Sequence, residues 1–134
     1  MTQRDVTVSN LAGGVRSTWS VGPHAGAADE QAENGGGDTG PEPHDFVLMG
    51  LGACTAMTLR LYADRKGWPL DAVHVTLGLE KVVHEGKKST RIQRTIRVEG
   101  ALDDEQRARL LEIANKCPVH QTLSGEITIA SALG

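Results

Sequence analysis

Hydrophobic and polar residues alternate at the start of the chain. Residues 4–11 place their apolar side chains on one face, and residues 15–21 repeat the pattern after two glycines at positions 13 and 14. Such alternation is typical of half-buried strands, and paired glycines suit the turn between them. We therefore predict an N-terminal β-hairpin. Residues 25–43 are rich in Gly, Asp and Glu instead, and we predict a long connection that is disordered in its middle.

The longest apolar stretch follows this connection. Residues 46–57 read Phe-Val-Leu-Met-Gly-Leu-Gly-Ala-Cys-Thr-Ala-Met, and we predict a helix from about His44 to Lys66 that Gly67 ends. The apolar run is too short to span a bilayer and Arg60 soon follows it, so we expect a core helix. A helix that is apolar nearly all round must be surrounded by protein. In so short a chain, a second copy of the chain is the economical way to cover the remaining face.

Alternation returns in the second half of the chain. Residues 73–80 predict a half-buried strand, residues 85–88 its turn, and Ile92, Ile96 and Val98 share one face of the returning strand. A helix with Asp103 as its N-cap should then run until Pro118 interrupts its hydrogen bonds.

A short helix over 118–124 and a final strand over 126–132 complete the order ββ-α-ββ-α-α-β. The sequence thus predicts one α+β domain over residues 1–134.

Composition narrows the classes of function. The chain has 134 residues, a net charge of −3, and few aromatic residues, so we expect neither a nucleic-acid surface nor a flat cofactor. No apolar leader opens the chain, and we expect a cytoplasmic protein that does not associate with membranes. In that compartment two cysteines are more often catalytic, redox-active or free than a structural disulfide.

The two cysteines lie in unlike surroundings. Cys54 is in the middle of the apolar helix, where a thiol resists ionisation unless a cation or a hydrogen-bond donor reaches it from elsewhere. Cys117 precedes Pro118, which suits the first position of a helix, so Cys117 should be the N-cap of the short helix. Backbone N–H groups and the neighbouring Lys116 would favour a thiolate there, and His120 is a possible further contributor.

The segments Gly50-Leu51-Gly52-Ala53-Cys54-Thr55-Ala56-Met57-Thr58-Leu59-Arg60 and Cys117-Pro118-Val119-His120 closely resemble the two signatures of the OsmC/Ohr family, the osmotically inducible and organic-hydroperoxide-resistance proteins. The order of elements and the cysteine spacing fit as well. The resemblance implies an intertwined homodimer whose antiparallel sheets wrap around paired central helices.

It also implies a peroxidase that needs no cofactor and acts on small organic hydroperoxides. Cys54 would be oxidised to a sulfenic acid, Cys117 would form a disulfide with it, and a dithiol reductant would reset the pair.

The chain departs from better-studied members ahead of the first cysteine. Those members carry an Asn-Pro-Glu segment whose glutamate lies beside an activating arginine, whereas this chain has Glu42-Pro43-His44. His44 therefore occupies the glutamate position, and Glu42 or Asp45 is a possible substitute. The resemblance nominates Arg16, just after the first turn, as the activating arginine. These departures resemble a less characterised branch of the family.

Two other readings remain open from the residues alone. The same scaffold could hold a small apolar ligand between its helices without turnover, or serve as a redox sensor. A metal site has the right atom types in His24, His44, Asp45, Cys117 and His120, but their spacing matches no compact ligand pattern, so we expect no metal.

Overall fold

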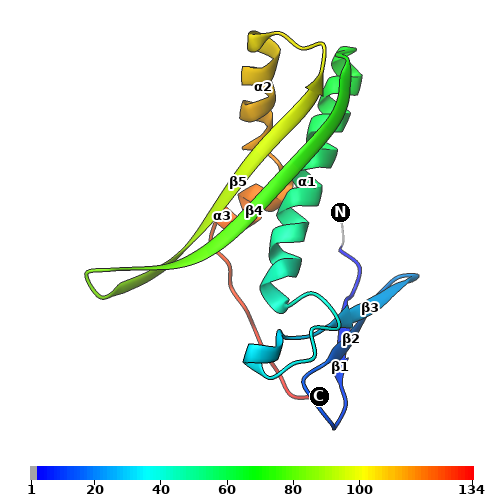
Figure 1. Cartoon of the computed structure of the whole chain (residues 1–134), viewed down its shortest axis with the longest axis vertical. Helices are drawn as coiled ribbons and strands as arrows, with labels where there is room; N and C mark the ends of the chain where they lie inside the picture. Colours follow the sequence, from blue (N-terminus) through cyan, green and yellow to red (C-terminus); the bar gives the residue numbers. More distant parts are fainter. Residues whose placement is uncertain (1–2) are drawn as a thin grey trace. The chain divides into compact units, whose positions relative to one another are not determined.

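Residues 3–134 are described in the computed structural model, and they form an α+β protein (Figure 1). The predicted class is therefore confirmed. The chain divides into two units, one ending at Val47 and one beginning at Leu48. The elements in order are β1 (Thr7–Asn10), β2 (Ser17–Val21), β3 (His24–Ala28), the 3-10 helix η1 (Ala32–Asn34), α1 (Pro43–Lys66), β4 (Leu70–His84), β5 (Lys87–Gly100), α2 (Asp104–Ala114) and α3 (Pro118–Ser124).

The N-terminal unit contains an antiparallel sheet in the order β1-β2-β3. The predicted hairpin is β1 and β2, and β3 extends it with a third strand where the sequence predicted loop. Gly26 makes this pairing possible, because a Cβ there would lie 2.3 Å from the ring of Trp19. The indole N–H of Trp19 donates to the carbonyl of Ala27 at 3.3 Å, and its ring meets Phe46 edge-on.

The connection after β3 is ordered around one buried carboxylate, so the prediction of a disordered middle is wrong. Asp29 accepts hydrogen bonds from the backbone N–H groups of Glu30, Gly37 and Thr39 at 2.8, 3.2 and 3.0 Å. The Thr39 hydroxyl donates a fourth at 2.6 Å. Chiefly because of this hydroxyl, the pKa of Asp29 falls from 3.8 to about 2. The connection has little preference for helix or strand, and it is ordered by hydrogen bonds between residues up to ten positions apart.

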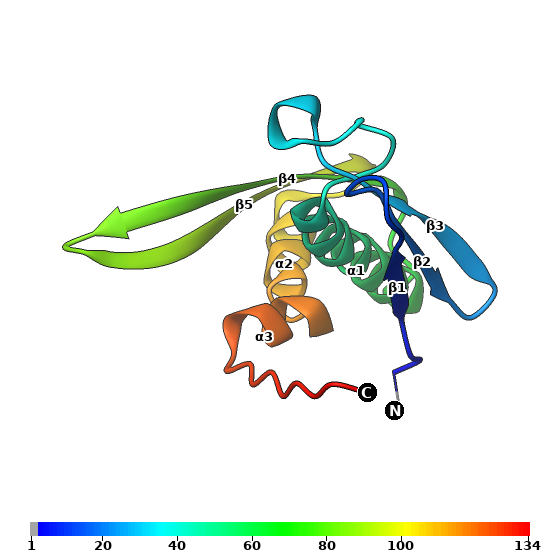
Figure 2. The ribbon, with the colours of Figure 1, turned by 90° about the horizontal axis from the view of Figure 1, so that it is seen from below.

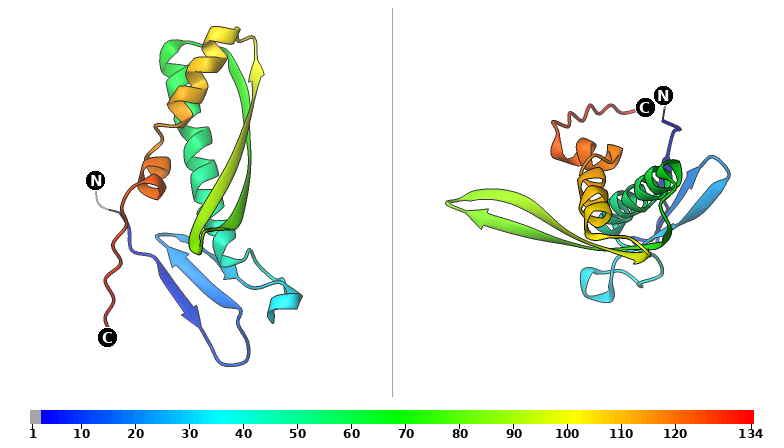
Figure 3. Two further views of the ribbon diagram at one scale, coloured as in Figure 1. Left: turned by 90° about the vertical axis from the view of Figure 1, so that its left-hand side faces the viewer. Right: turned by 90° about the horizontal axis from the view of Figure 1, so that it is seen from above.

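The C-terminal unit is a long two-stranded hairpin with helices on one face. Figures 1 and 3 show α1 and α2 side by side on the same face of β4 and β5, and the far end of the hairpin projects beyond them in Figure 2. Between these layers lies a core of fully or largely buried residues: Leu59, Ala63, Leu70, Leu110, Ile113 and Ala114. Leu59 and Leu110 are its largest fully buried members.

The predicted central helix is confirmed as α1. Gly52 lets the helix approach β4 closely, because a Cβ at this position would lie 2.9 Å from the Leu77 side chain. The whole helix has 24 residues and is long and apolar enough to cross a membrane by length and composition, although its uninterrupted apolar run over residues 46–57 is shorter. One such helix is weak support for a membrane span, since core helices pass the same test. Leu59 and Ala63 of α1 do lie in the core of this unit.

Local signals located the last helices correctly. Asp103 is the N-cap of α2 and forms a reciprocal capping box with Gln106, and α3 begins at Pro118. The predicted strand over 126–132 is wrong for the single chain, because residues 125–134 form no regular element. A strand exists only with a partner ladder, and none of the described residues pairs with this segment. Ile127, Ile129 and Leu133 are consequently exposed.

Candidate functional site

Cys117 is fully buried at the start of α3. It is the N-cap of this helix, as predicted, and its sulfur accepts a hydrogen bond from the backbone N–H of His120 at 3.4 Å. Pro118 is the first residue of the helix and has no N–H group of its own to satisfy. Cys117 therefore has a fixed position, away from solvent, with a backbone donor on its sulfur.

Cys54 lies on α1 and is only partly buried. Its sulfur is 4.0 Å from the hydroxyl of Thr58, one turn along the helix, and both cysteines are free thiols. The next residue, Thr55, points into the unit and is fully buried. Its hydroxyl oxygen is 4.0 Å from the sulfur of Cys117. Thr55, the immediate neighbour of Cys54, is thus the residue of this helix whose side chain contacts Cys117 in the reduced structure.

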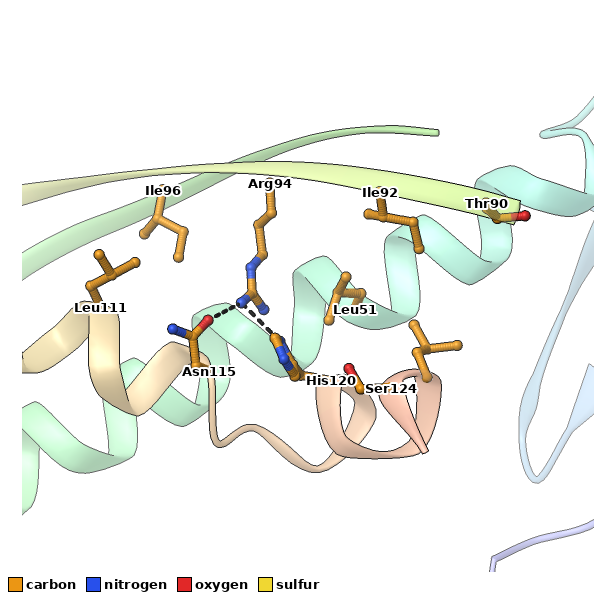
Figure 4. A pocket seen from close by; sticks show the side chains of 10 residues that line it. Leu51, Thr90, Ile92, Arg94, Ile96, Leu111, Asn115, His120 and Ser124 are labelled. Carbon is orange, nitrogen blue, oxygen red and sulfur yellow. Dashed lines mark hydrogen bonds between the residues drawn. The ribbon is translucent and has the colours of Figure 1, made fainter. Parts of the chain in front are cut away.

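Arg94 of β5 joins these elements from the opposite side. Its guanidinium donates to the Thr55 hydroxyl, to the Asn115 side-chain oxygen and to Nδ1 of His120, each at 3.0 Å. Figure 4 shows the side chain reaching from the strand toward the junction of α2 and α3. Because an arginine can only donate, Nδ1 of His120 is the acceptor, and Nε2 carries the ring proton of the neutral imidazole. His120 is therefore a positioned residue rather than a solvated one.

Sequence reasoning missed Arg94, although a signal was present. Ile92 and Ile96 were assigned to the inward face of their strand, and the period of two places Arg94 on the same face between them. A charged residue in the middle of an inward face is uncommon and calls for partners. The three partners come from α1, the end of α2, and α3, so spacing along the chain does not reveal them.

A pocket opens beside this cluster. Its volume is about 510 Å³, within the range of small-molecule sites. Apolar side chains from α1, β5, α2 and α3 form much of the wall, and Asn115 and His120 lie beside the guanidinium (Figure 4). The lining residues are Leu51, Thr90, Ile92, Arg94, Ile96, Leu111, Asn115, His120, Leu123 and Ser124.

The other predicted site residues belong to the N-terminal unit or to the first turn of α1. Arg16 donates through Nε to the Thr39 hydroxyl at 3.1 Å, which ties it to the Asp29 cluster. Asp45 accepts from the backbone N–H of Glu42 at 3.0 Å.

His44 lies 4.0 Å from the carboxylate of Glu42. The contacts of Arg16, Glu42, His44 and Asp45 fall within this unit, so an action of Arg16 on Cys54 remains a prediction. Among residues 3–134, no three His, Cys, Asp or Glu side chains gather in a way that could hold a metal ion.

Comparison with known families decides the membership of the chain. The model of the OsmC-like protein family matches residues 35–132, which include both cysteines and all of the pocket. The chain belongs to the OsmC-like family. No curated protein matches its sequence.

Solved structures share the OsmC-like fold over nearly the whole chain. An OsmC-like protein from Mycoplasma pneumoniae is 19% identical, with a TM-score of 0.79 over 92% of this chain and 89% of that one. An organic hydroperoxide resistance protein OsmC from Legionella pneumophila is 17% identical, with a TM-score of 0.72 over 93% and 91%. The organic hydroperoxide resistance protein OhrB of Bacillus subtilis is also 17% identical, with a TM-score of 0.67 over 92% of each chain.

These likenesses establish an OsmC-like fold for this chain. Identities of this size do not transfer a specific activity, which depends on the site rather than on the fold.

Proposed function

We propose that the protein reduces small organic hydroperoxides with its two cysteines. The Cys54 thiolate attacks the terminal oxygen of the hydroperoxide, the O–O bond breaks, and the alcohol leaves after taking up a proton. The sulfur is then a sulfenic acid. Cys117 attacks that sulfur, water leaves, and a disulfide joins the two residues. A dithiol reductant, itself oxidised to a disulfide, returns both thiols. The reaction needs reduced thiols, which is consistent with a cytoplasmic location.

The difference in exposure between the two cysteines carries the assignment of roles. Cys54 is partly exposed on α1, whereas Cys117 is fully buried behind Thr55. A hydroperoxide from solvent therefore meets Cys54 first, and the buried thiol is kept from direct oxidation. Cys117 lies against Thr55, the residue next to Cys54, so the two thiols come from neighbouring positions in the fold, and forming the disulfide requires a movement that brings their sulfurs together. The sulfurs of a disulfide are about 2 Å apart.

Activation of Cys54 is assigned, on the family resemblance, to Arg16. Its guanidinium is held through the Thr39 hydroxyl by the ordered connection around Asp29. In this proposal the glutamate of better-studied members is replaced by the group at the start of α1, where His44, Glu42 and Asp45 lie. The variant described in the Discussion tests the arginine.

A homodimer completes the proposed assembly. Met49, Ala53, Met57 and Leu61 are exposed and lie four residues apart, so they form one apolar stripe along α1. Ile127, Ile129 and Leu133 add exposed apolar surface near the C-terminus. Surface of this kind on a small protein marks an interaction site, and a second copy of the chain is the occupant we propose.

Two cysteine variants test the peroxidase. Cys54→Ser should abolish consumption of cumene hydroperoxide, because no attacking thiol remains. Cys117→Ser should consume one equivalent and stop, leaving a sulfenic acid on Cys54 that dimedone labels and mass spectrometry locates. If both variants consume one equivalent equally, or if the label appears on Cys117 of the Cys54→Ser variant, the roles are assigned wrongly.

A second candidate is a non-catalytic ligand-binding or redox-sensing protein on the same scaffold, and the pocket beside Arg94 favours it. Counting free thiols before and after one equivalent of an organic hydroperoxide separates a peroxidase from a purely binding protein, and repeated turnover with excess hydroperoxide and dithiol separates it from a redox sensor. A peroxidase loses both thiols rapidly and recovers them with a dithiol, whereas a purely binding protein retains them.

A further inference from the structure

Arg94 carries a positive charge that no acid of the described chain neutralises. The ion pairs among residues 3–134 do not include it, and its three partners at Thr55, Asn115 and His120 are neutral acceptors. The residue is partly buried on the inward face of β5, where a charge without a counter-ion is unfavourable. Its position is therefore one that an added anion would stabilise.

The guanidinium also keeps donors in reserve. An arginine has five N–H groups, and the contacts within residues 3–134 use three of them. The three bonds fix the plane and direction of the group, so an incoming ligand meets a preorganised donor. Preorganisation of this kind lowers the entropy that binding must overcome.

The lining of the pocket suits a ligand that has a negative charge and an apolar part. No aspartate or glutamate lines it, and Arg94 is the one residue of the lining with a permanent charge. His120 offers a further donor beside the guanidinium, because Nε2 of the imidazole carries its proton. The hydroxyls of Thr90 and Ser124 add polar groups elsewhere on the wall. The remaining wall is made largely of aliphatic side chains: Leu51, Ile92, Ile96, Leu111 and Leu123.

We infer that this pocket binds an organic monoanion, with a carboxylate on the guanidinium of Arg94 and an apolar body against the aliphatic wall. Carboxylates form charge-assisted hydrogen bonds with arginine that are stronger than neutral ones. The pocket volume of about 510 Å³ suits a molecule larger than an inorganic ion. The inference concerns binding alone, and it stands whether or not the two thiols turn over a hydroperoxide.

Titration calorimetry with a matched pair of ligands tests the inference. The probes are 4-phenylbutanoate and its neutral amide, which have nearly the same shape. The reduced wild-type protein should bind the carboxylate about tenfold or more tightly than the amide, because only the anion adds an opposite charge to the hydrogen bond from the guanidinium. Equal affinities, or no binding of the carboxylate at millimolar concentration, would overturn the inference.

Variants on β5 locate the site. Arg94→Met should remove the preference for the carboxylate and weaken the amide much less than the carboxylate, whereas Arg94→Lys should retain part of the preference. Arg91→Met is the control, because Arg91 is an exposed arginine three positions earlier on the opposite face of the strand. Retention of the full preference by Arg94→Met, or its loss in Arg91→Met, would contradict the assignment.

A third variant covers the case in which loss of Arg94 prevents folding. Leu123→Trp fills the pocket from α3 without touching the three hydrogen bonds, and it should weaken both ligands together. Unchanged binding of both would place the site elsewhere. Because all titrations are done without hydroperoxide, failure here leaves the peroxidase proposal standing, and inactivity toward hydroperoxides leaves this one standing.

Discussion

Met57 offers the sharpest test of the proposed assembly. Its side chain is 65% exposed in the single chain, and that of Leu61, one turn further along the stripe, is 68% exposed. Complete burial of such a side chain contributes about 1.5–3 kcal/mol, so burying the remaining two thirds should contribute about 1–2 kcal/mol. A twofold interface contains each residue twice. Replacing Met57 in both copies should therefore cost about 2–4 kcal/mol of dimerisation free energy.

Met57→Glu should weaken the dimer by roughly 30-fold to 1,000-fold in Kd, before any repulsion between the two buried carboxylates is added. Sedimentation velocity across a range of micromolar concentrations measures the change directly. Lys66→Glu is the control, because it places the same acid on the same helix at a position off the stripe and changes the net charge by two units instead of one.

Two results would refute the reasoning. One is a wild-type protein that is a stable monomer at micromolar concentration. The other is a Met57→Glu variant that dimerises as tightly as the wild type while remaining folded by circular dichroism. Equal weakening by Lys66→Glu would show that net charge, rather than the apolar stripe, controls the association.

Three further changes test other parts of the molecule. Arg16→Met in a Cys117→Ser background should move the pH profile for alkylation of Cys54 to higher pH, since a cation that favours the thiolate is lost; an unmoved profile assigns that role to another residue. Asp29→Asn should destabilise the protein at neutral pH and flatten the pH dependence of urea unfolding. The pKa of this carboxyl is 3.8 ordinarily and about 2 in the fold, so its contribution is present above 3.8 and is lost as the pH falls toward 2. Asp103→Ala should lower the free energy of unfolding by about 1 kcal/mol through loss of the α2 cap, and Asp104→Ala, which does not cap, should lower it less.

Local signals in the sequence were sufficient for most of the C-terminal unit. Pro118 predicted both the start of α3 and the capping position of Cys117, and Asp103 predicted the start of α2. The alternation over residues 73–80 predicted β4. In each case one or two neighbouring residues determine the local backbone conformation, so the element could be predicted from the sequence alone.

Features that depend on contacts between residues far apart in the sequence were not predicted. The connection after β3 is ordered by Asp29, whose partners at Gly37 and Thr39 lie eight and ten residues away. In the cluster at Arg94, the guanidinium binds Thr55, which lies 39 positions earlier in the chain. The strand predicted over residues 126–132 was wrong for a different reason. The alternation is present in the sequence, but none of the described residues supplies a strand that pairs with this segment.

The hydroxyl of Thr55 lies between the sulfur of Cys117 and the guanidinium of Arg94 and contacts both. It has one proton and gives it to the carbonyl of Leu51 at 2.7 Å, so the hydrogen shared with Cys117 must come from the thiol. In the proposed peroxidase cycle that sulfur enters a disulfide, which removes this hydrogen and leaves Arg94 as the donor to Thr55 among the contacts described. The Thr55 oxygen thus contacts both the thiol that the proposed cycle would oxidise and the guanidinium that would bind the proposed anion. By thermodynamic reciprocity, an anion that prefers one oxidation state shifts the midpoint reduction potential by the free energy of that preference. If the proposed anion binds one oxidation state more tightly, it would change how easily the proposed disulfide is reduced.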